Sequence, residues 1–143
     1  MALMVGQFAI LNITPDSFSD GNESNLDASW SVAKAKELLQ LGADFVDIGA
    51  ESTRPGASFV STEQEWSRLR SFLEVFDSEL QGADTVLSLD SRNPQVIKQV
   101  FQEYGKKFAF LNDVTGLQNP ELLRVVADHI DPAVKLISMH SKG

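Results

Sequence analysis

Polar side chains directly follow short apolar runs at five places in this chain. The five blocks are ILNITPDSFSDG (10–21), DIGAESTRPG (47–56), SLDS (88–91), FLNDVTG (110–116) and ISMHSKG (137–143). A short apolar run that leads into polar turn residues is typical of a buried strand opening into a loop. Loops at the carboxyl ends of parallel strands carry the chemistry of many α/β proteins. These blocks are therefore the candidate site.

Thr53 and Arg54, in the second block, are suited to binding phosphate. Arg54 offers a planar fork of hydrogen-bond donors and Thr53 offers a hydroxyl, and both groups match phosphate oxygens. The alternative is a structural loop in which Arg54 pairs with Glu51 or Asp47. The residues of this block leave both interpretations open.

Asp90 and Asn112 each end a later apolar run. The Asp90 carboxylate can accept hydrogen bonds from an amino-heterocycle or cap the next helix, although Asn93, just before Pro94, is better placed as the cap. The Asn112 amide can both donate and accept, which suits a ring edge that carries both kinds of group.

The residue types favour magnesium over zinc as a candidate metal. The sequence has no cysteine, no HExxH spacing and no histidine pair, and it also lacks the Gly-x-Ser-x-Gly elbow of serine hydrolases. His140 at a strand end and His129 near a helix end are each expected to be structural, His129 as a complement to the helix dipole. The oxygen- and amide-rich blocks suit Mg²⁺ held loosely together with a phosphate-bearing substrate.

Composition predicts one soluble, intracellular domain over residues 1–143, located in the cytoplasm. The chain has 143 residues, 43% of them apolar, with nine Phe and a net charge of −8. No lysine or arginine precedes Lys34, and no apolar run approaches the roughly 18 residues of a membrane span. The acidic balance argues against nucleic acid or an anionic membrane as a partner, but not against an anionic small substrate.

Periodicity predicts five strands that alternate with four helices. The expected strands are residues 5–12, 44–48, 85–89, 108–112 and 134–139. Apolar stripes at helical spacing lie between them, for example Leu69, Leu73 and Phe76. The expected caps are Thr62 with Glu65 as a capping box, Asn93 and Asn119 each before a proline, and Gly42, Gly82 and Gly105 at helix C-termini.

This alternation is compatible with a doubly wound sheet or with a parallel (β/α)8 barrel of the TIM type. The barrel is favoured, because no glycine-rich nucleotide loop follows the first strand and because polar residues end each of the first four strands. A barrel needs about 250 residues, so this chain would hold only the first four and a half βα units.

Taken together, the five blocks resemble the successive signature blocks of dihydropteroate synthase, a pterin-binding TIM-barrel enzyme of folate synthesis that sulfonamide drugs inhibit. The resemblance covers the whole chain and about the first half of the family's barrel. It implies a transferase that condenses 6-hydroxymethyl-7,8-dihydropterin diphosphate with 4-aminobenzoate. The products are 7,8-dihydropteroate and diphosphate.

The resemblance also implies a role for each matched residue. Asn12 matches the asparagine whose amide oxygen coordinates Mg²⁺, and Asp90 and Asn112 match the pair that reads the pterin ring. Thr53 and Arg54, the implied catalytic residues, match the loop that reaches the diphosphate and the aminobenzoate. The implied substrate contacts further include Ser17, Phe18 and Pro55.

In the family the diphosphate leaves first, so Mg²⁺, Arg54 and backbone amides would stabilise the charge on the leaving group. Closure of the two loops TPDSFSDG and STRPG would exclude water from the pterin methyl cation. Ala50, Ser91 and Ser141 are small departures from the family pattern. The large departure is that the family's later aspartate, lysine, arginine and histidine have no counterparts in this chain.

The missing half-site predicts that this chain alone binds substrate poorly and turns over negligibly. A half barrel would also leave the first and fifth strands as apolar edges, which predicts a homo-oligomer, an exchange of elements, or pairing with a complementary C-terminal half. The alternative function is a non-catalytic half barrel that binds a pterin or a partner protein. Another pterin-binding barrel, such as a methyltetrahydrofolate methyltransferase, is disfavoured because that group lacks the TPDSFSDG block.

Overall fold

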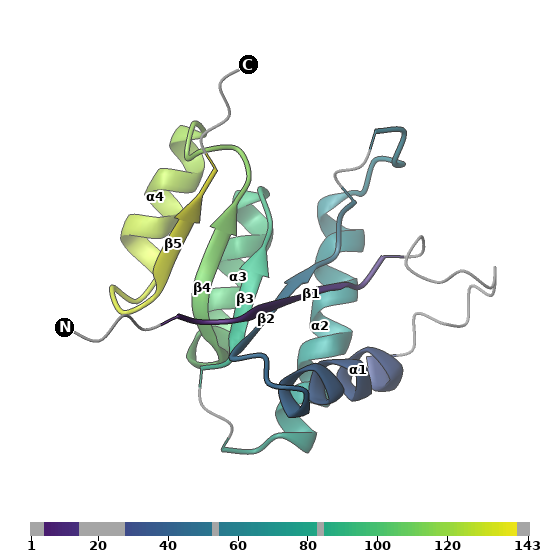
Figure 1. Ribbon diagram of the computed structural model, residues 1–143. Helices are drawn as coiled ribbons and strands as arrows, with labels where there is room; N and C mark the ends of the chain where they lie inside the picture. The colour runs from purple at the N-terminus through teal and green to yellow at the C-terminus, as the bar shows by residue number, and fades with distance from the viewer. Residues whose placement is uncertain (1–4, 15–27, 53–54, 83–84, 140–143) are drawn as a thin grey trace.

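The computed structural model describes residues 5–14, 28–52, 55–82 and 85–139, which form five strands and four α-helices in strict alternation (Figure 1). The strands lie close to their predicted positions. They are β1 (Phe8–Asn12), β2 (Phe45–Gly49), β3 (Leu87–Asp90), β4 (Phe108–Asp113) and β5 (Lys135–Ser138). The helices are α1 (Ala28–Gln40), α2 (Thr62–Glu79), α3 (Pro94–Tyr104) and α4 (Pro120–His129), with a short 3-10 turn, η3 (Gly105–Lys107), after α3.

All five strands are parallel and lie in the sheet in the order in which they occur in the chain, β1-β2-β3-β4-β5. A doubly wound sheet reverses its strand order at a switch point, whereas a barrel adds each strand beside the last. The order therefore confirms the predicted barrel class, here as a partial barrel.

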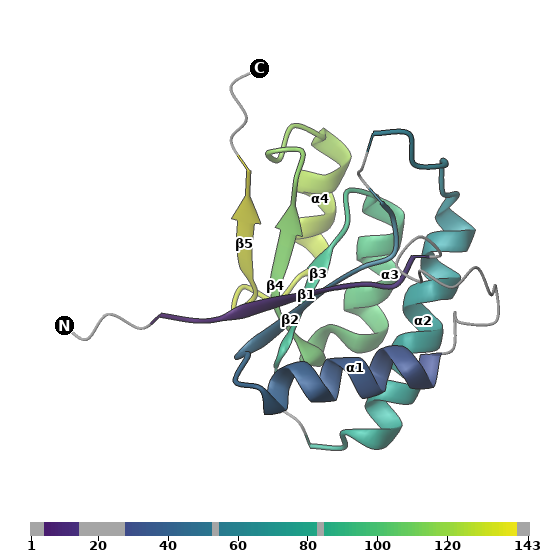
Figure 2. The same cartoon turned by 45° about the vertical axis from the view of Figure 1, so that its right-hand side comes forward.

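The four helices cover one face of the sheet and leave the other face without a helix (Figures 1 and 2). Fully buried side chains between the sheet and these helices form the core, among them Val46, Leu89 and Leu111 from the strands and Phe72 and Ile97 from the helices. Because side chains alternate along a strand, the intervening strand residues belong to the opposite face, called here the inner face.

Helix α2 begins with a capping box, but one residue earlier than predicted. The Ser61 side chain accepts from the Gln64 backbone N–H, and the Gln64 side chain accepts from the Ser61 backbone N–H at 3.0 Å. The predicted Thr62 and Glu65 pair was therefore wrong. Both patterns carry a hydroxyl residue three before a Glu or Gln, and Glu65 is unavailable because it is buried and bonded elsewhere.

Of the other predicted caps, four are confirmed and one is wrong. Asn93 and Asn119 cap α3 and α4 as predicted, each with proline at the first helical position. Gly42 and Gly82 adopt left-handed φ values of 107° and 79° after α1 and α2. Gly105 does not, since its φ is −52° and the chain tightens into η3 instead.

Candidate functional site

Three of the predicted site residues lie at one level of the inner face, at the carboxyl ends of their strands. Asn12 is paired in register with Gly49, Gly49 with Asp90, and Asp90 with Asn112. Residues paired in register across parallel strands point to the same side of the sheet. The structure thus brings Asn12, Asp90 and Asn112 together along the rim of β1, β3 and β4.

Asp47 joins this group, although sequence reasoning did not single it out as a site residue. It lies one level below the rim on β2, only 7% exposed, and its Oδ2 accepts a hydrogen bond from Asn112 Nδ2 at 3.2 Å. This bond passes over β3, which separates β2 from β4 in the sheet. An ionised carboxylate can only accept, so Asp47 fixes which end of the Asn112 amide faces it.

Buried polar atoms around Asp47 have unused hydrogen-bonding capacity. Within the described part of the chain, Asp47 Oδ1, Asn112 Oδ1 and Ser88 Oγ form no hydrogen bond. Ser88 is paired with Asp47 in the register of β2 and β3. Buried polar atoms are rarely left unpaired, so these atoms are candidates for bonds to bound water or to a ligand. This cluster offers mainly acceptors, which suits a ligand edge rich in N–H donors.

The electrostatics of the rim favour a ligand that donates hydrogen bonds. Burial raises the pKa of Asp90 from 3.8 to about 6, and the charges of Asp47, Glu51 and Asp113 add to the shift. Burial also raises the pKa of Asp47, while the hydrogen bond from the Asn112 amide opposes that rise. A ligand that donates N–H groups to Asp90 relieves part of this repulsion.

The loop after β2 is anchored by an ion pair that the sequence did not predict. Arg92, just after β3, donates to both Glu51 oxygens at 2.9 and 3.1 Å. One sequence interpretation paired Arg54 with Glu51 or Asp47, but Arg54 lies outside the described residues. Glu51 is therefore held by Arg92, and the Asp47 bond described above comes from Asn112.

Asp113 supports the site without belonging to it. It is 1% exposed, and it accepts from the backbone N–H groups of Thr115 and Leu117 and from the Thr115 hydroxyl at 2.6 to 2.9 Å. These bonds close the loop after β4, in which Leu117 has a φ of 59°. Such bonds are the role of an Asp that organises a turn.

Asn12 fits the loosely held magnesium ion that the sequence suggested. Its side chain is exposed at the end of β1, so its amide oxygen can bind a cation while water and phosphate supply the other ligands. Among the described residues no group of three or more His, Cys, Asp or Glu side chains could hold a metal.

Several predicted residues cannot be placed in this geometry. Ser17, Phe18, Thr53, Arg54 and His140 lie outside the described residues. Pro55 is described and exposed, and it precedes Gly56, whose φ is 84°.

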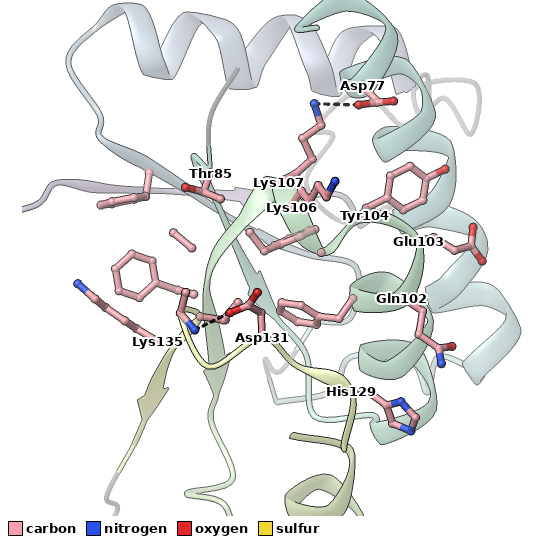
Figure 3. Close-up of a pocket in the computed structure, with 18 residues that line it drawn as sticks. Asp77, Thr85, Gln102, Glu103, Tyr104, Lys106, Lys107, His129, Asp131 and Lys135 are labelled. Atoms are coloured by element: carbon pink, nitrogen blue, oxygen red, sulfur yellow. Dashed lines mark hydrogen bonds and ion pairs between the residues drawn. The ribbon is translucent and has the colours of Figure 1, made fainter. Parts of the chain in front are cut away.

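A separate groove lies at the opposite end of the strands (Figure 3). It is lined near the starts of β3, β4 and β5 by Thr85, Lys107 and Lys135 among others. Lys107 is paired with Asp77 at 2.8 Å, and the Lys135 ammonium lies 5.8 Å from the centre of the Phe110 ring. Neither Asp90 nor Asn112 lines this groove, so it is distinct from the candidate site.

The sequence contained a pattern that could have placed Asp47 and Ser88 on the inner face. In FVDIG and LSLD these residues have the same strand parity as Gly49 and Asp90, and a polar residue inside a short apolar strand points to a face that is not packed in the core. Only the register between strands shows that they share one face.

The described fold and rim define a class: a parallel β/α partial barrel with a group of polar side chains, the candidate ligand site, at the carboxyl ends of its strands. Within the described residues, no helix is long and apolar enough to cross a membrane. The family model for pterin binding enzymes matches residues 8–143. The chain belongs to this family.

The relatives are dihydropteroate synthases. The enzyme of Neisseria meningitidis serogroup C is 38% identical over 134 residues, covering 94% of this chain and 44% of the relative. The Anaplasma phagocytophilum enzyme with bound 6-hydroxymethylpterin-monophosphate has a TM-score of 0.76 and 36% identity, covering 96% of this chain and 49% of that one. The Yersinia pestis enzyme in a sulfonamide complex has a TM-score of 0.73 and 34% identity, covering 95% and 46%. The chain thus spans less than half the length of each of these three relatives.

Proposed function

We propose that this chain forms the N-terminal half of a dihydropteroate synthase barrel and carries the pterin-reading part of its site. The supporting observation is the rim group, in which Asp90 and Asn112 lie at one level and Asp47 holds the Asn112 amide at 3.2 Å. An acceptor-rich cluster of this kind suits the amino and ring N–H groups of a dihydropterin. The reaction is the condensation of 6-hydroxymethyl-7,8-dihydropterin diphosphate with 4-aminobenzoate.

Each residue has one task in this proposal. Asp90 and Asn112 bind the pterin edge and orient its methylene carbon. Thr53 and Arg54 bind the diphosphate and stabilise the charge that develops on it as it leaves, with Pro55 forming an apolar wall. Ser17 and Phe18, which follow β1 in the sequence, contribute further substrate contacts.

Asn12 is the residue that would hold Mg²⁺ through its amide oxygen. The ion, when bound, supplies positive charge beside the diphosphate. Exposure of Asn12 at the end of β1 supports this assignment, because a magnesium ion that keeps several waters needs an open position.

A chimera tests the proposed function. Residues 8–139 of this chain replace the matched segment of the Neisseria meningitidis enzyme, and dihydropteroate formation is measured. We expect activity that Asp90→Ala lowers by at least about tenfold, since it removes a charged hydrogen-bond acceptor. Asp128→Ala, on the exposed side of α4, is the matched control and should have no effect. A folded chimera that binds the pterin without turnover would favour the alternative of a non-catalytic half barrel.

The isolated chain is expected to bind a dihydropterin diphosphate analogue with Mg²⁺ only weakly and to turn over negligibly. Titration calorimetry measures the binding, with Asn12→Ala and Asp90→Ala as further controls. Rapid product formation by the purified chain would contradict the proposed half-site. The predicted homo-oligomer or complementing C-terminal half, the domain assignment to residues 1–143 and the cytoplasmic location stay predictions.

A further inference from the structure

A stripe of three polar side chains runs along the start of α2. Thr62, Glu65 and Arg68 follow one another at intervals of three residues, so they lie on one side of the helix. The same helix packs apolar residues such as Leu69 and Phe72 into the core. The stripe therefore comes from a helix that the core already holds in place.

Two members of the stripe hold the loop after β3. Ser91 Oγ donates to Glu65 Oε1 at 2.6 Å, and Asn93 Nδ2 donates to Thr62 Oγ1 at 2.8 Å. The Ser91 hydroxyl also accepts from the Asn93 backbone N–H at 3.2 Å. Both capacities of this hydroxyl are thus used, and its position is defined.

The third member of the stripe holds the loop after β2. Arg68 Nη1 donates to the Ala50 carbonyl oxygen at 2.9 Å. The next residue, Glu51, is joined to Arg92 in the loop after β3. Thus α2 fixes the two loops that leave β2 and β3, and the loops are tied to each other.

Glu65 has an unusual environment for an acidic residue. It is only 2% exposed, and among the described residues no cation forms a salt bridge with it. Burial raises its pKa, the charges of Glu51 and Asp90 add to that rise, and the Ser91 hydroxyl and Arg92 oppose it. Burying a carboxylate near other acids costs stability, and an apolar residue would fill the same space at lower cost.

We infer that Glu65 is a positioning residue for ligand binding: it holds the Ser91 hydroxyl and thereby sets the place of Asp90, the preceding residue, at the rim. The inference rests on the proposed function, because Asp90 is there the pterin contact. Asp90 and Ser91 share a peptide unit, so the bonds that fix the Ser91 hydroxyl also restrain the backbone that carries the Asp90 carboxylate. Small displacements of a binding group are costly, since hydrogen bonds weaken steeply with geometry.

Paired substitutions in this chain separate positioning from stability. Ser91→Ala leaves the Glu65 carboxylate buried without the hydroxyl that donates to it. The double variant Glu65→Leu with Ser91→Ala removes both polar groups. Ser91→Thr keeps the hydroxyl, and Glu74→Ala changes an exposed acid on the same helix as a control. Three quantities are measured: the free energy of unfolding in urea and the ¹³C resonance of the Asp90 carboxyl without ligand, both in this chain, and the affinity for 6-hydroxymethylpterin-monophosphate in the chimera described above.

We expect Ser91→Ala to lower stability and to weaken binding by about tenfold, while Ser91→Thr and Glu74→Ala stay within about threefold of the parent. The double variant should recover stability but not affinity, and its Asp90 resonance should remain shifted. Recovery of both affinity and resonance in the double variant would overturn the inference. The resonance is read without ligand, so it tests the role of Glu65 separately from the proposed function. A folded chimera whose activity is unaffected by Asp90→Ala would count against the proposed function instead.

Discussion

At the scale of a single residue, Asp90, the proposed pterin contact, has an electrostatic cost. Its carboxylate is crowded by burial and by the charges of Asp47, Glu51 and Asp113, which together place its pKa at about 6. A group whose pKa is raised by folding binds its proton more tightly in the folded state. Stability is therefore highest below the unfolded pKa and falls as the pH rises from about 4 to about 6. Burial of Asp47 and Glu65 raises their pKa values and acts in the same direction.

Asp90→Asn should make the protein more stable at pH 7 and flatten this fall between pH 4 and 6. The amide cannot ionise, so it removes the Asp90 share of the repulsion while Asp47 and Glu65 keep theirs. Urea unfolding at pH 4, 5, 6 and 7 measures the effect, with Asp128→Asn on the exposed side of α4 as the control. Equal pH slopes for the parent and Asp90→Asn would show that Asp90 titrates normally.

Asp113→Ala should lower the free energy of unfolding by about 2 to 4 kcal/mol, because three half-buried donor groups in the loop after β4 lose the buried carboxylate that accepts from them. Asp131 provides a matched control, since it is exposed and accepts from the Ala133 backbone N–H at 2.8 Å. Asp131→Ala should cost under about 1 kcal/mol. Chemical denaturation of the two variants gives the comparison, and similar losses would contradict the supporting role of Asp113.

At the scale of secondary-structure elements, α3 and α4 have similar N-terminal caps but different tertiary contacts. Asn93 and Asn119 each accept a backbone N–H of the following turn, and each precedes a proline. Asn93 also donates to Thr62 of α2, so its side chain joins two helices as well as capping one. The start of α3 is therefore bonded to the polar stripe of α2 that holds the site loops.

Asn119→Ala should cost about 1 kcal/mol, the usual value for a lost N-cap. Asn93→Ala should cost about 2 kcal/mol, because it loses the cap and the bond to Thr62. A double-mutant cycle of Asn93→Ala with Thr62→Val, followed by urea unfolding, isolates the second part. A coupling energy near zero would mean that the bond to Thr62 contributes nothing to stability.

At the scale of the whole molecule, the main feature is the inner face of the sheet, which none of the described helices covers. Its amino end holds three rings from three strands, Phe8, Phe45 and Phe110, with centroids 4.8 to 5.1 Å apart. Phe8 is 41% exposed and Ile10 is 71% exposed. Parallel sheets are normally covered on both faces, and here β1 and β5 are also edges. These features favour association through the inner face and the edges.

Ile10→Lys should therefore reduce self-association of the chain. A charge on the inner face of an edge strand opposes both burial of that face and strand pairing. Light scattering over a range of concentrations measures the change. Leu41→Lys is the matched control, since Leu41 is 75% exposed but follows α1 on the other side of the sheet. A parent chain that stays monomeric at high concentration would contradict this expectation.

Local chemistry made the elements predictable from the sequence. The apolar runs, the helical stripes, and the caps at Asn93 and Asn119 depend on neighbours a few residues away, so they can be read in order along the chain. The same locality explains the errors. Ser61 and Thr62 carry equally suitable hydroxyls, and tertiary contacts of Glu65 decide between the two capping boxes.

The site was predictable only in part, because it depends on register across strands. Asn12, Asp90 and Asn112 were predicted as candidates from their positions at strand ends, and their roles stay predictions. The role of Asp47, the pairing of Glu51 with Arg92 and the burial of Glu65 were not, since each joins residues that are distant in sequence. Alternation along one strand gives a side chain one of two faces, but hydrogen bonding between strands and packing of α2 determine which side chains meet on a face.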